Sequence, residues 1–103
     1  MLVSNKYPEG SIVTFKLVNG DEVVAKVVNE TALNFTVVAP YTVMPSQQGI
    51  GILPSLFTTE PDGEITISRS HIMLHAPTFS HMVNHYLHTT TGIEPVTAGD
   101  IIV

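Results

Sequence analysis

The first third of the chain alternates between apolar and polar residues with a period of two. Residues 11–18 and 21–29 are rich in β-branched side chains, and they flank Asn19-Gly20. Such alternation is typical of half-buried strands, and Asn-Gly between two strands is a strong signal for a β-hairpin. The sequence therefore predicts a hairpin over residues 11–29.

The apolar positions also predict the register of this hairpin. A two-residue loop would place apolar residues opposite charged ones, whereas a three-residue loop with Gly20 in the left-handed conformation matches apolar with apolar. The favoured register pairs Phe15 with Val23 and Val13 with Ala25. One core face then contains Val13, Phe15, Leu17, Val23, Ala25 and Val27.

Three further strands are predicted along the chain. Residues 33–44 form the third strand, which Pro40 disturbs or bends, and a Gly- and Pro-rich stretch contains a fourth strand over residues 51–57. The fifth strand covers residues 64–75 and is broken or bulged near Arg69-Ser70.

The period then changes from that of a strand to that of a helix. Apolar residues recur at helical spacing, Thr78 is placed to cap the start, and Gly92 is placed to cap the end. The sequence predicts one amphipathic helix over residues 78–91, followed by a tail over residues 93–103 whose apolar end favours docking. The apolar face of the helix contains Phe79, Met82, Val83, Tyr86 and Leu87.

Five strands and one helix indicate a small, strongly bent antiparallel sheet or partly open barrel, with the helix over one end or face. We expect a single domain over residues 1–103, in which the barrel covers residues 11–76. An open sheet of this kind has exposed edges, and in a chain with few charges those edges favour pairing between subunits.

Composition narrows the function classes. Of the 103 residues, 44% are hydrophobic and 13% are charged, and the net charge is −5. This charge excludes a broad basic face, so nonspecific nucleic-acid binding is not expected. The absence of Cys excludes disulfides. The N-terminal sequence lacks the apolar core of a signal peptide, and no apolar run is long enough to span a membrane, so we predict a cytoplasmic location without membrane association.

The hairpin and the residues after it carry a family resemblance. The stretch "VTFKLVNG" leads to a small residue, an aliphatic residue and then "ETALN" over residues 30–34. This pattern resembles the first motif of the Sm-like proteins, the ring-forming family that includes Hfq, although the spacing before the acidic residue is one shorter than usual. The positions that match are Ala25 (small), Val27 (aliphatic), Glu30 (acidic) and Leu33-Asn34 (the terminal pair).

The second motif of that family is an Ile-Arg-Gly-like turn between the last two strands. It is echoed by "ITISRSHIMLHAP" over residues 65–77, where Arg69 stands near the expected place but no Gly follows it. The helix also follows the strands here, whereas the family usually begins with one. This layout is most similar to Sm-like proteins encoded by bacteriophages, which would place the chain in the cytoplasm of the host cell.

The resemblance implies a five-stranded Sm-like (SH3-like or OB-like) barrel, a homo-oligomeric ring, and single-stranded RNA bound around its pore. It implies that Asn34 holds a base and that Arg69 covers it. Beyond the family pattern, His71 is a further candidate for a stacking or hydrogen-bonding surface. Glu30 completes the candidate nucleic-acid-binding set. The position of the family's stacking aromatic is Ala32, which has no ring.

Each candidate also has a structural interpretation. Asn34 at a strand corner can stabilise its own turn, and Arg69 can form a salt bridge with an acidic neighbour. The leading hypothesis is an RNA-binding or RNA-chaperone ring. The alternative is an oligomeric scaffold of phage type that contacts host or phage proteins and has lost RNA binding.

All five histidines lie between residues 71 and 88. His81, His85 and His88 share one face of the predicted helix, where two residues one turn apart could bind Zn²⁺. No carboxylate accompanies them, so we predict solvated side chains that gain charge near pH 6, and neither a metal nor a cofactor. His71 and His75 are expected to share a strand face. No nucleophile elbow, phosphate loop or paired-carboxylate cleft is visible, so we do not expect an enzyme.

Overall fold

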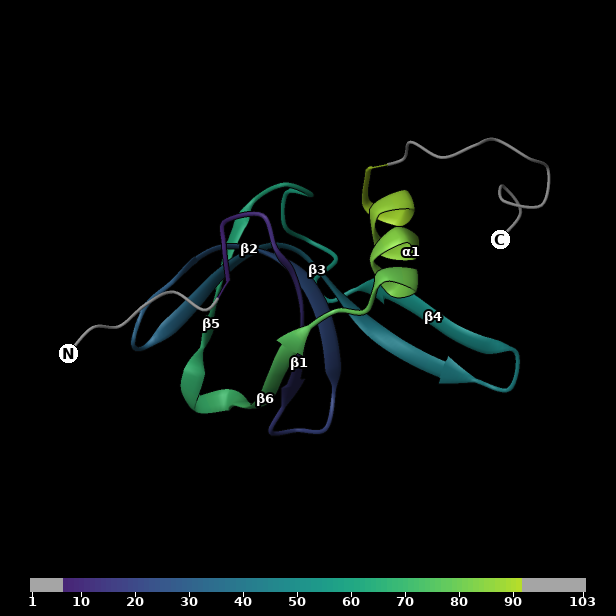
Figure 1. Cartoon of the computed structure of the whole chain (residues 1–103), viewed down its shortest axis with the longest axis horizontal. Helices are drawn as coiled ribbons and strands as arrows, with labels where there is room; N and C mark the ends of the chain where they lie inside the picture. Colours follow the sequence, from purple (N-terminus) through teal and green to yellow (C-terminus); the bar gives the residue numbers. More distant parts are fainter. Residues whose placement is uncertain (1–6, 92–103) are drawn as a thin grey trace.

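A computed structural model describes residues 7–91, which form a mainly β fold with one α-helix (Figure 1). The helix lies near the C-terminal end of the chain, as the sequence predicts. In chain order the elements are β1 (Ile12–Leu17), β2 (Glu22–Glu30), β3 (Asn34–Ser46), β4 (Gly49–Pro54), β5 (Glu64–Ser68), the 3-10 helix η1 (Arg69–His71), β6 (Ile72–Pro77) and α1 (Ser80–Thr91).

The strands form one antiparallel sheet in the order β4-β3-β2-β1-β6, and β5 pairs with the first part of β3. The prediction of five strands is therefore wrong, because the sheet has six. The predicted fifth strand is divided at Arg69 by η1, where the Ser68 side chain accepts a hydrogen bond from the backbone N–H of Ser70. The sheet is not closed, since β5 and β6 do not pair with each other within residues 7–91.

The predicted register of the first hairpin is confirmed. Phe15 lies opposite Val23, and Val13 lies opposite Ala25. Gly20 has a φ of +97°, which a residue with a Cβ rarely adopts, so glycine is required at this point of the loop. The backbone N–H of Leu17 donates to the carbonyl of Asp21 at 2.8 Å and closes the turn.

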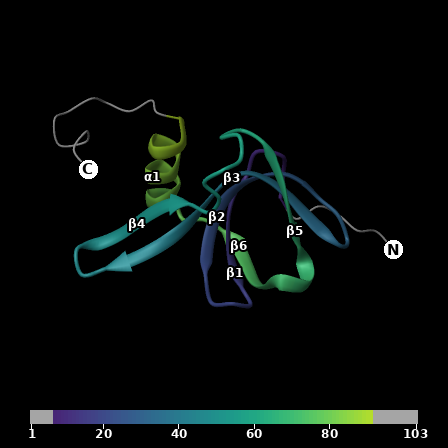
Figure 2. The same ribbon diagram turned by 180° about the vertical axis from the view of Figure 1, so that it is seen from behind.

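The long strand β3 bends at its middle. Ala39 has a φ of +50° and is followed by Pro40, whose carbonyl accepts a hydrogen bond from the backbone N–H of Ser55. Before the bend β3 pairs with β5, and after it β3 pairs with β4. The second part of β3 and β4 together form a hairpin that projects from the body (Figures 1 and 2), and we call residues 41–54 the β3–β4 arm.

The main core lies on the concave face of the sheet. Phe15 and Phe35 pack edge to face with ring centroids 4.9 Å apart. Full burial of a Val or Phe side chain contributes roughly 1.5–3 kcal/mol, so this cluster supplies most of the driving force for the bent sheet. The predicted core face is confirmed, with Leu17 partly buried at its edge. The buried cluster consists of Tyr7, Val13, Phe15, Ala25, Val27, Phe35 and Val37.

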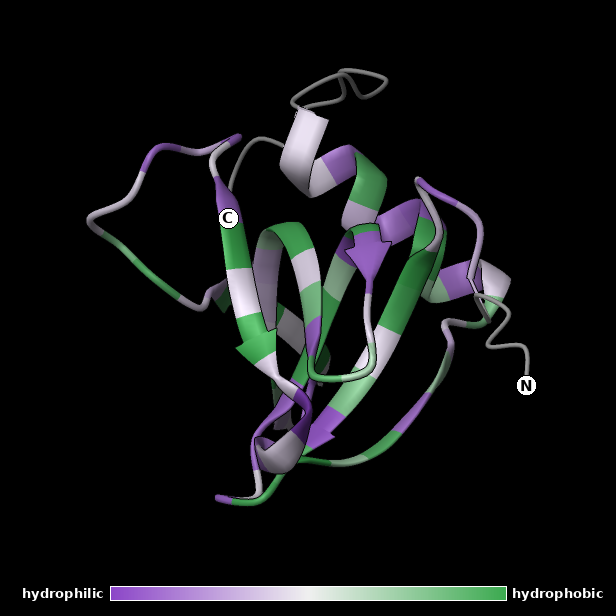
Figure 3. Ribbon diagram, turned by 90° about the vertical axis from the view of Figure 1, so that its left-hand side faces the viewer, coloured by the Kyte–Doolittle hydropathy of each residue, from purple (hydrophilic) through white to green (hydrophobic). Residues whose placement is uncertain are grey.

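A second, smaller core lies between the sheet and α1. Met82 and Tyr86 are the buried residues of the helix, and Val24 is buried on a strand whose other face forms the main core. Val23, Val24 and Ala25 are consecutive and all buried, so β2 is buried on both faces at this point. Figure 3 shows the alternation of hydrophobic and polar positions along the strands.

Two details of the predicted helix are wrong. The Thr78 hydroxyl bonds to the Thr14 hydroxyl at 2.7 Å and does not cap the helix, which begins at Ser80. Phe79, predicted to face the core, is exposed and stacks on His81. The predicted cap at Gly92 and the tail over residues 93–103 lie outside the described residues.

Candidate functional site

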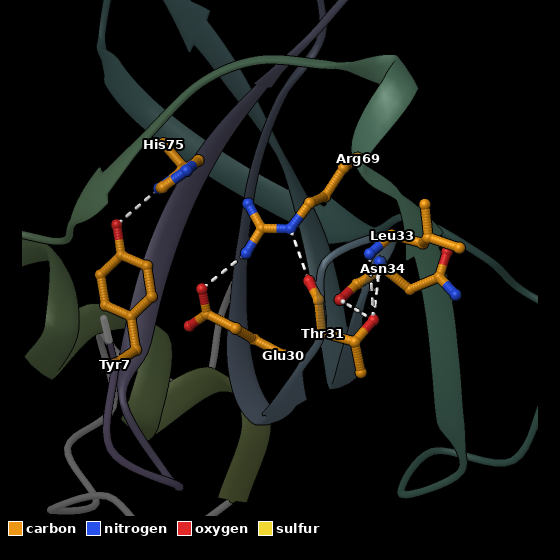
Figure 4. A network of polar contacts seen from close by, with 7 residues as sticks. All are labelled: Tyr7, Glu30, Thr31, Leu33, Asn34, Arg69 and His75. Carbon is orange, nitrogen blue, oxygen red and sulfur yellow. Dashed lines mark hydrogen bonds and ion pairs between the residues drawn. The ribbon is translucent and has the colours of Figure 1, made fainter. Parts of the chain in front are cut away.

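The corner between β2 and β3 carries the candidate residues of the first motif. The Thr31 hydroxyl accepts hydrogen bonds from the backbone N–H groups of Leu33 (3.2 Å) and Asn34 (3.0 Å). The backbone N–H of Thr31 donates in turn to the Asn34 carbonyl at 2.8 Å. The threonine side chain therefore stabilises this turn. The Asn34 amide points away from Arg69 (Figure 4).

Arg69 lies across this corner and is held there by four interactions. Its guanidinium donates through Nη2 to Glu30 Oε2 at 2.6 Å and through Nε to the Thr31 carbonyl at 2.7 Å (Figure 4). Its Cζ lies 4.4 Å from the centre of the Phe35 ring. Its backbone N–H donates to the Leu33 carbonyl. Arg69 therefore joins η1 to the corner, and the structural interpretation of this residue as a salt-bridge partner is confirmed.

The ion pair is markedly asymmetric. The Glu30 side chain is 5% exposed and that of Arg69 is 31% exposed. Glu30 Oε1 is buried and has no hydrogen-bond partner among the described residues. A buried carboxylate with one cation depends strongly on that cation, because removal of the partner would leave an uncompensated charge.

Tyr7 and His75 extend this cluster on its other side. The Tyr7 hydroxyl and His75 Nδ1 share a hydrogen bond of 2.7 Å (Figure 4). The His75 ring also lies edge-on to that of Phe35, with centroids 5.3 Å apart. Burial raises the pKa of Tyr7, the Glu30 carboxylate raises it further, and Arg69 partly opposes this shift. The sequence did not predict that Tyr7 and His75 form a pair, because no local pattern links positions that are 68 residues apart.

His71 lies apart from the corner. It is an exposed residue of η1, and its carbonyl accepts a hydrogen bond from the backbone N–H of Val18. His71 lines a shallow pocket of about 390 Å³ beside the first hairpin loop, together with Leu17 and Asn19. The prediction that His71 and His75 share a strand face is wrong, because His71 is the last residue of η1 and only His75 belongs to β6. The structure thus brings Glu30 and Arg69 together, with Asn34 beside them and His71 elsewhere.

The helix histidines do not form a metal centre in this structure. His81, His85 and His88 are exposed. Within the part of the chain that the structure describes, no three His, Asp or Glu side chains are placed to hold a metal ion. Across residues 7–91, none of the helices has the length and apolar character that crossing a bilayer requires.

The corner therefore offers a rigid, partly apolar surface rather than a free cation. Ala32 and Leu33 are exposed at its tip, while the charges of Glu30 and Arg69 neutralise each other beneath it. No protein-family model and no curated protein sequence matches this chain. The functional interpretation therefore depends on the geometry and on the motif in the first hairpin.

Proposed function

We propose that this chain is an Sm-like subunit that pairs through its strand edges into a homo-oligomeric ring, and that the ring acts as a protein-interaction scaffold. One observation carries the proposal. Within residues 7–91, β5 pairs only with β3 and β6 pairs only with β1, so two strands joined by η1 each have a free edge. A β5 edge of one copy and a β6 edge of the next could continue the sheet from subunit to subunit.

The side chains on β6 support this use of the edge. Met73 and Leu74 are large apolar residues, and Leu74 is 65% exposed. Charged residues and proline usually protect an edge from pairing; β6 contains no Asp, Glu, Lys or Arg, and its proline, Pro77, stands at its last position. The resemblance of the first hairpin to the Sm-like motif supports the ring over an open chain of subunits.

Native mass spectrometry of the full chain tests the proposal. We expect a single species whose mass is a multiple of the 11.2 kDa subunit. Leu74→Lys places a charge on the β6 edge and is expected to shift the mass to that of the monomer. Phe79→Lys is the matched control, because Phe79 is also 65% exposed but lies outside both edge strands, and it is expected to keep the oligomeric mass. A wild-type monomer at tens of micromolar would overturn the proposal.

Binding of single-stranded RNA is the second candidate function. Its specific support is the Asn34 amide, which forms no side-chain hydrogen bond within the described residues and stands beside the exposed Leu33. Because Ala32 provides no ring and stacking contributes about 1–3 kcal/mol per base, affinity would depend on repetition around the ring.

Fluorescence anisotropy with short U-rich and A-rich RNA, followed through a salt titration, tests this second function. We expect Asn34→Ala to weaken binding and Asn29→Ala, an exposed amide on β2, to leave it unchanged. No binding at low salt would leave the scaffold alone. Capture of host proteins that persists after nuclease treatment would favour the scaffold directly.

A further inference from the structure

A second concave site lies away from the corner, where the bend of β3 meets the loop between β4 and β5. It has a volume of about 240 Å³, and the last turn of α1 closes one side. This is smaller than the roughly 300–1,000 Å³ of pockets for drug-sized ligands, so it suits a single side chain. The residues that carry the argument are Tyr41, Pro54, Phe57, Glu60, Pro61 and Thr90.

The wall of this site is apolar and aromatic, with one charge. Phe57 is 76% exposed, so its ring is open to a partner. Residues 31–59 contain no charged residue, and Glu60 is the first one after them. Among the described residues the Glu60 carboxylate has neither a hydrogen bond nor an ion pair. Thr90 belongs to the last turn of α1, where the helix dipole also favours a positive charge.

We propose that this pocket binds an arginine side chain of a different protein. The aliphatic part of the side chain would lie against Pro54 and Pro61, and the guanidinium would stack on an aromatic ring and pair with Glu60. Arginine fits better than lysine because its planar, weakly hydrated guanidinium stacks on rings and pairs with carboxylates at the same time.

The same combination already occurs once inside this molecule. Arg69 stacks on Phe35 at 4.4 Å and pairs with Glu30 at 2.6 Å. Arg69 is the single arginine of the chain and is held by those contacts, so a second copy cannot supply the ligand. The partner is therefore another protein, and the net charge of −5 would attract a basic one. The pocket is formed within one chain, so this inference does not require the ring.

Amide chemical shifts of the ¹⁵N-labelled full chain, titrated with N-acetyl-arginine amide, test this assignment. We expect saturable shifts at Phe57, Thr59 and Glu60. N-acetyl-citrulline amide has the same shape without the charge and is expected to bind about two- to fivefold more weakly, the range that an exposed ion pair and ring contact provide.

Two charge-removing variants separate the pocket from a general attraction to acidic protein. Glu60→Gln is expected to weaken arginine binding about two- to fivefold, whereas Asp62→Asn, in the same turn but outside the pocket, is expected to leave it unchanged. Unchanged spectra of both variants away from the loop show that they fold. The inference is overturned if pocket amides do not shift, if citrulline binds as well as arginine, or if the two variants bind alike.

Discussion

Arg69 connects two parts of the chain that are 39 residues apart at its ion pair with Glu30. Its guanidinium contacts Phe35, Glu30 and the Thr31 carbonyl, and these contacts stabilise the fold. The residue that the family resemblance assigns to a base is thus a structural residue within one subunit.

The first prediction concerns this ion pair. Arg69→Met leaves the buried Glu30 carboxylate without a cation, and we expect a loss of about 2–4 kcal/mol in the free energy of unfolding, somewhat below the range for a fully buried pair because Arg69 is partly exposed. Urea unfolding followed by circular dichroism measures this loss.

The matched control is Lys26→Met, since Lys26 is an exposed cation on β2 and should change stability by less than about 0.5 kcal/mol. The double variant Glu30→Leu/Arg69→Met removes the buried charge as well, and it is expected to recover most of the loss. Equal costs for Arg69→Met and Lys26→Met would show that the ion pair does not stabilise the fold.

The second prediction concerns alkaline pH. Burial raises the pKa of Tyr86 well above its ordinary value of 10.0, and nearby Tyr41 raises it further. Above pH 10 the unfolded chain therefore releases this proton while the folded chain keeps it, so the contribution of Tyr86 to stability is fully present below that pH and is lost above it. Urea unfolding at a series of pH values measures the decline.

Tyr86→Phe should remove most of this decline. At neutral pH it should cost about 1 kcal/mol, because the hydroxyl donates to the Ala39 carbonyl at 2.6 Å. Tyr7→Phe should remove a smaller part, since the pKa of Tyr7 is raised too. A decline of equal size in wild type and Tyr86→Phe would contradict the assignment.

The sequence singled out Glu30, Asn34 and Arg69, and it raised the possibility of a salt bridge for Arg69. It could not identify Glu30 as the partner, because their contact depends on how η1 lies over the corner. Tyr7 and His75 left no local signal at all, since their hydrogen bond is set by the curvature of the whole sheet.

At the scale of elements, the sequence predicted the strands that short-range signals determine better than those that depend on long-range contacts. The first hairpin follows from Gly20 and from apolar matching, both of which are short-range. The β3–β4 arm and the division between β5 and β6 were harder to predict. Gly- and Pro-rich segments carry weak periodicity, and η1 is held by backbone hydrogen bonds with Val18 of the first hairpin loop and Leu33 of the corner.

The third prediction concerns the bend of β3. Ala39 has a φ of +50°, a conformation that costs a residue with a Cβ about 1–2 kcal/mol, whereas glycine adopts it freely. After the greater flexibility of glycine in the unfolded chain is subtracted, Ala39→Gly is expected to stabilise the fold by about 0.5 kcal/mol. Thermal unfolding measures the change.

Ala32→Gly is the control for this substitution, since Ala32 is exposed and has no positive φ. Ala32→Gly makes the unfolded chain more flexible and relieves no strain in the folded one, so it should destabilise the fold by about 0.5–1 kcal/mol. If both variants lost stability equally, the bend would not be strained.

At the scale of the whole molecule, the charges are unevenly distributed. The net charge is −5, yet residues 31–59, which include the entire β3–β4 arm, contain no charged residue. The arm projects from the body (Figure 1). Met44 and Leu53 are each about half exposed. Copies that repel one another elsewhere can approach through this uncharged surface.

The fourth prediction follows from this distribution. Met44→Lys/Leu53→Lys should raise the concentration at which the protein starts to aggregate, because it places charge on an uncharged edge hairpin. Stability should change by less than about 1 kcal/mol, since neither side chain belongs to the core. Light scattering during concentration measures the onset. An unchanged onset would exclude the arm as the surface through which the protein aggregates.

The two-sided burial of β2 also affects how the protein loses its structure. Val24 lies opposite Tyr41, whose ring contacts that of Tyr86 in α1 at 5.9 Å, while Val23 and Ala25 are buried on the other face of β2. If α1 detached, one face of β2 would become exposed to water. The other face of the same strand belongs to the main core, so that core would lose support. Far-ultraviolet circular dichroism and tyrosine fluorescence should therefore change together with denaturant concentration, in one cooperative transition without a populated intermediate.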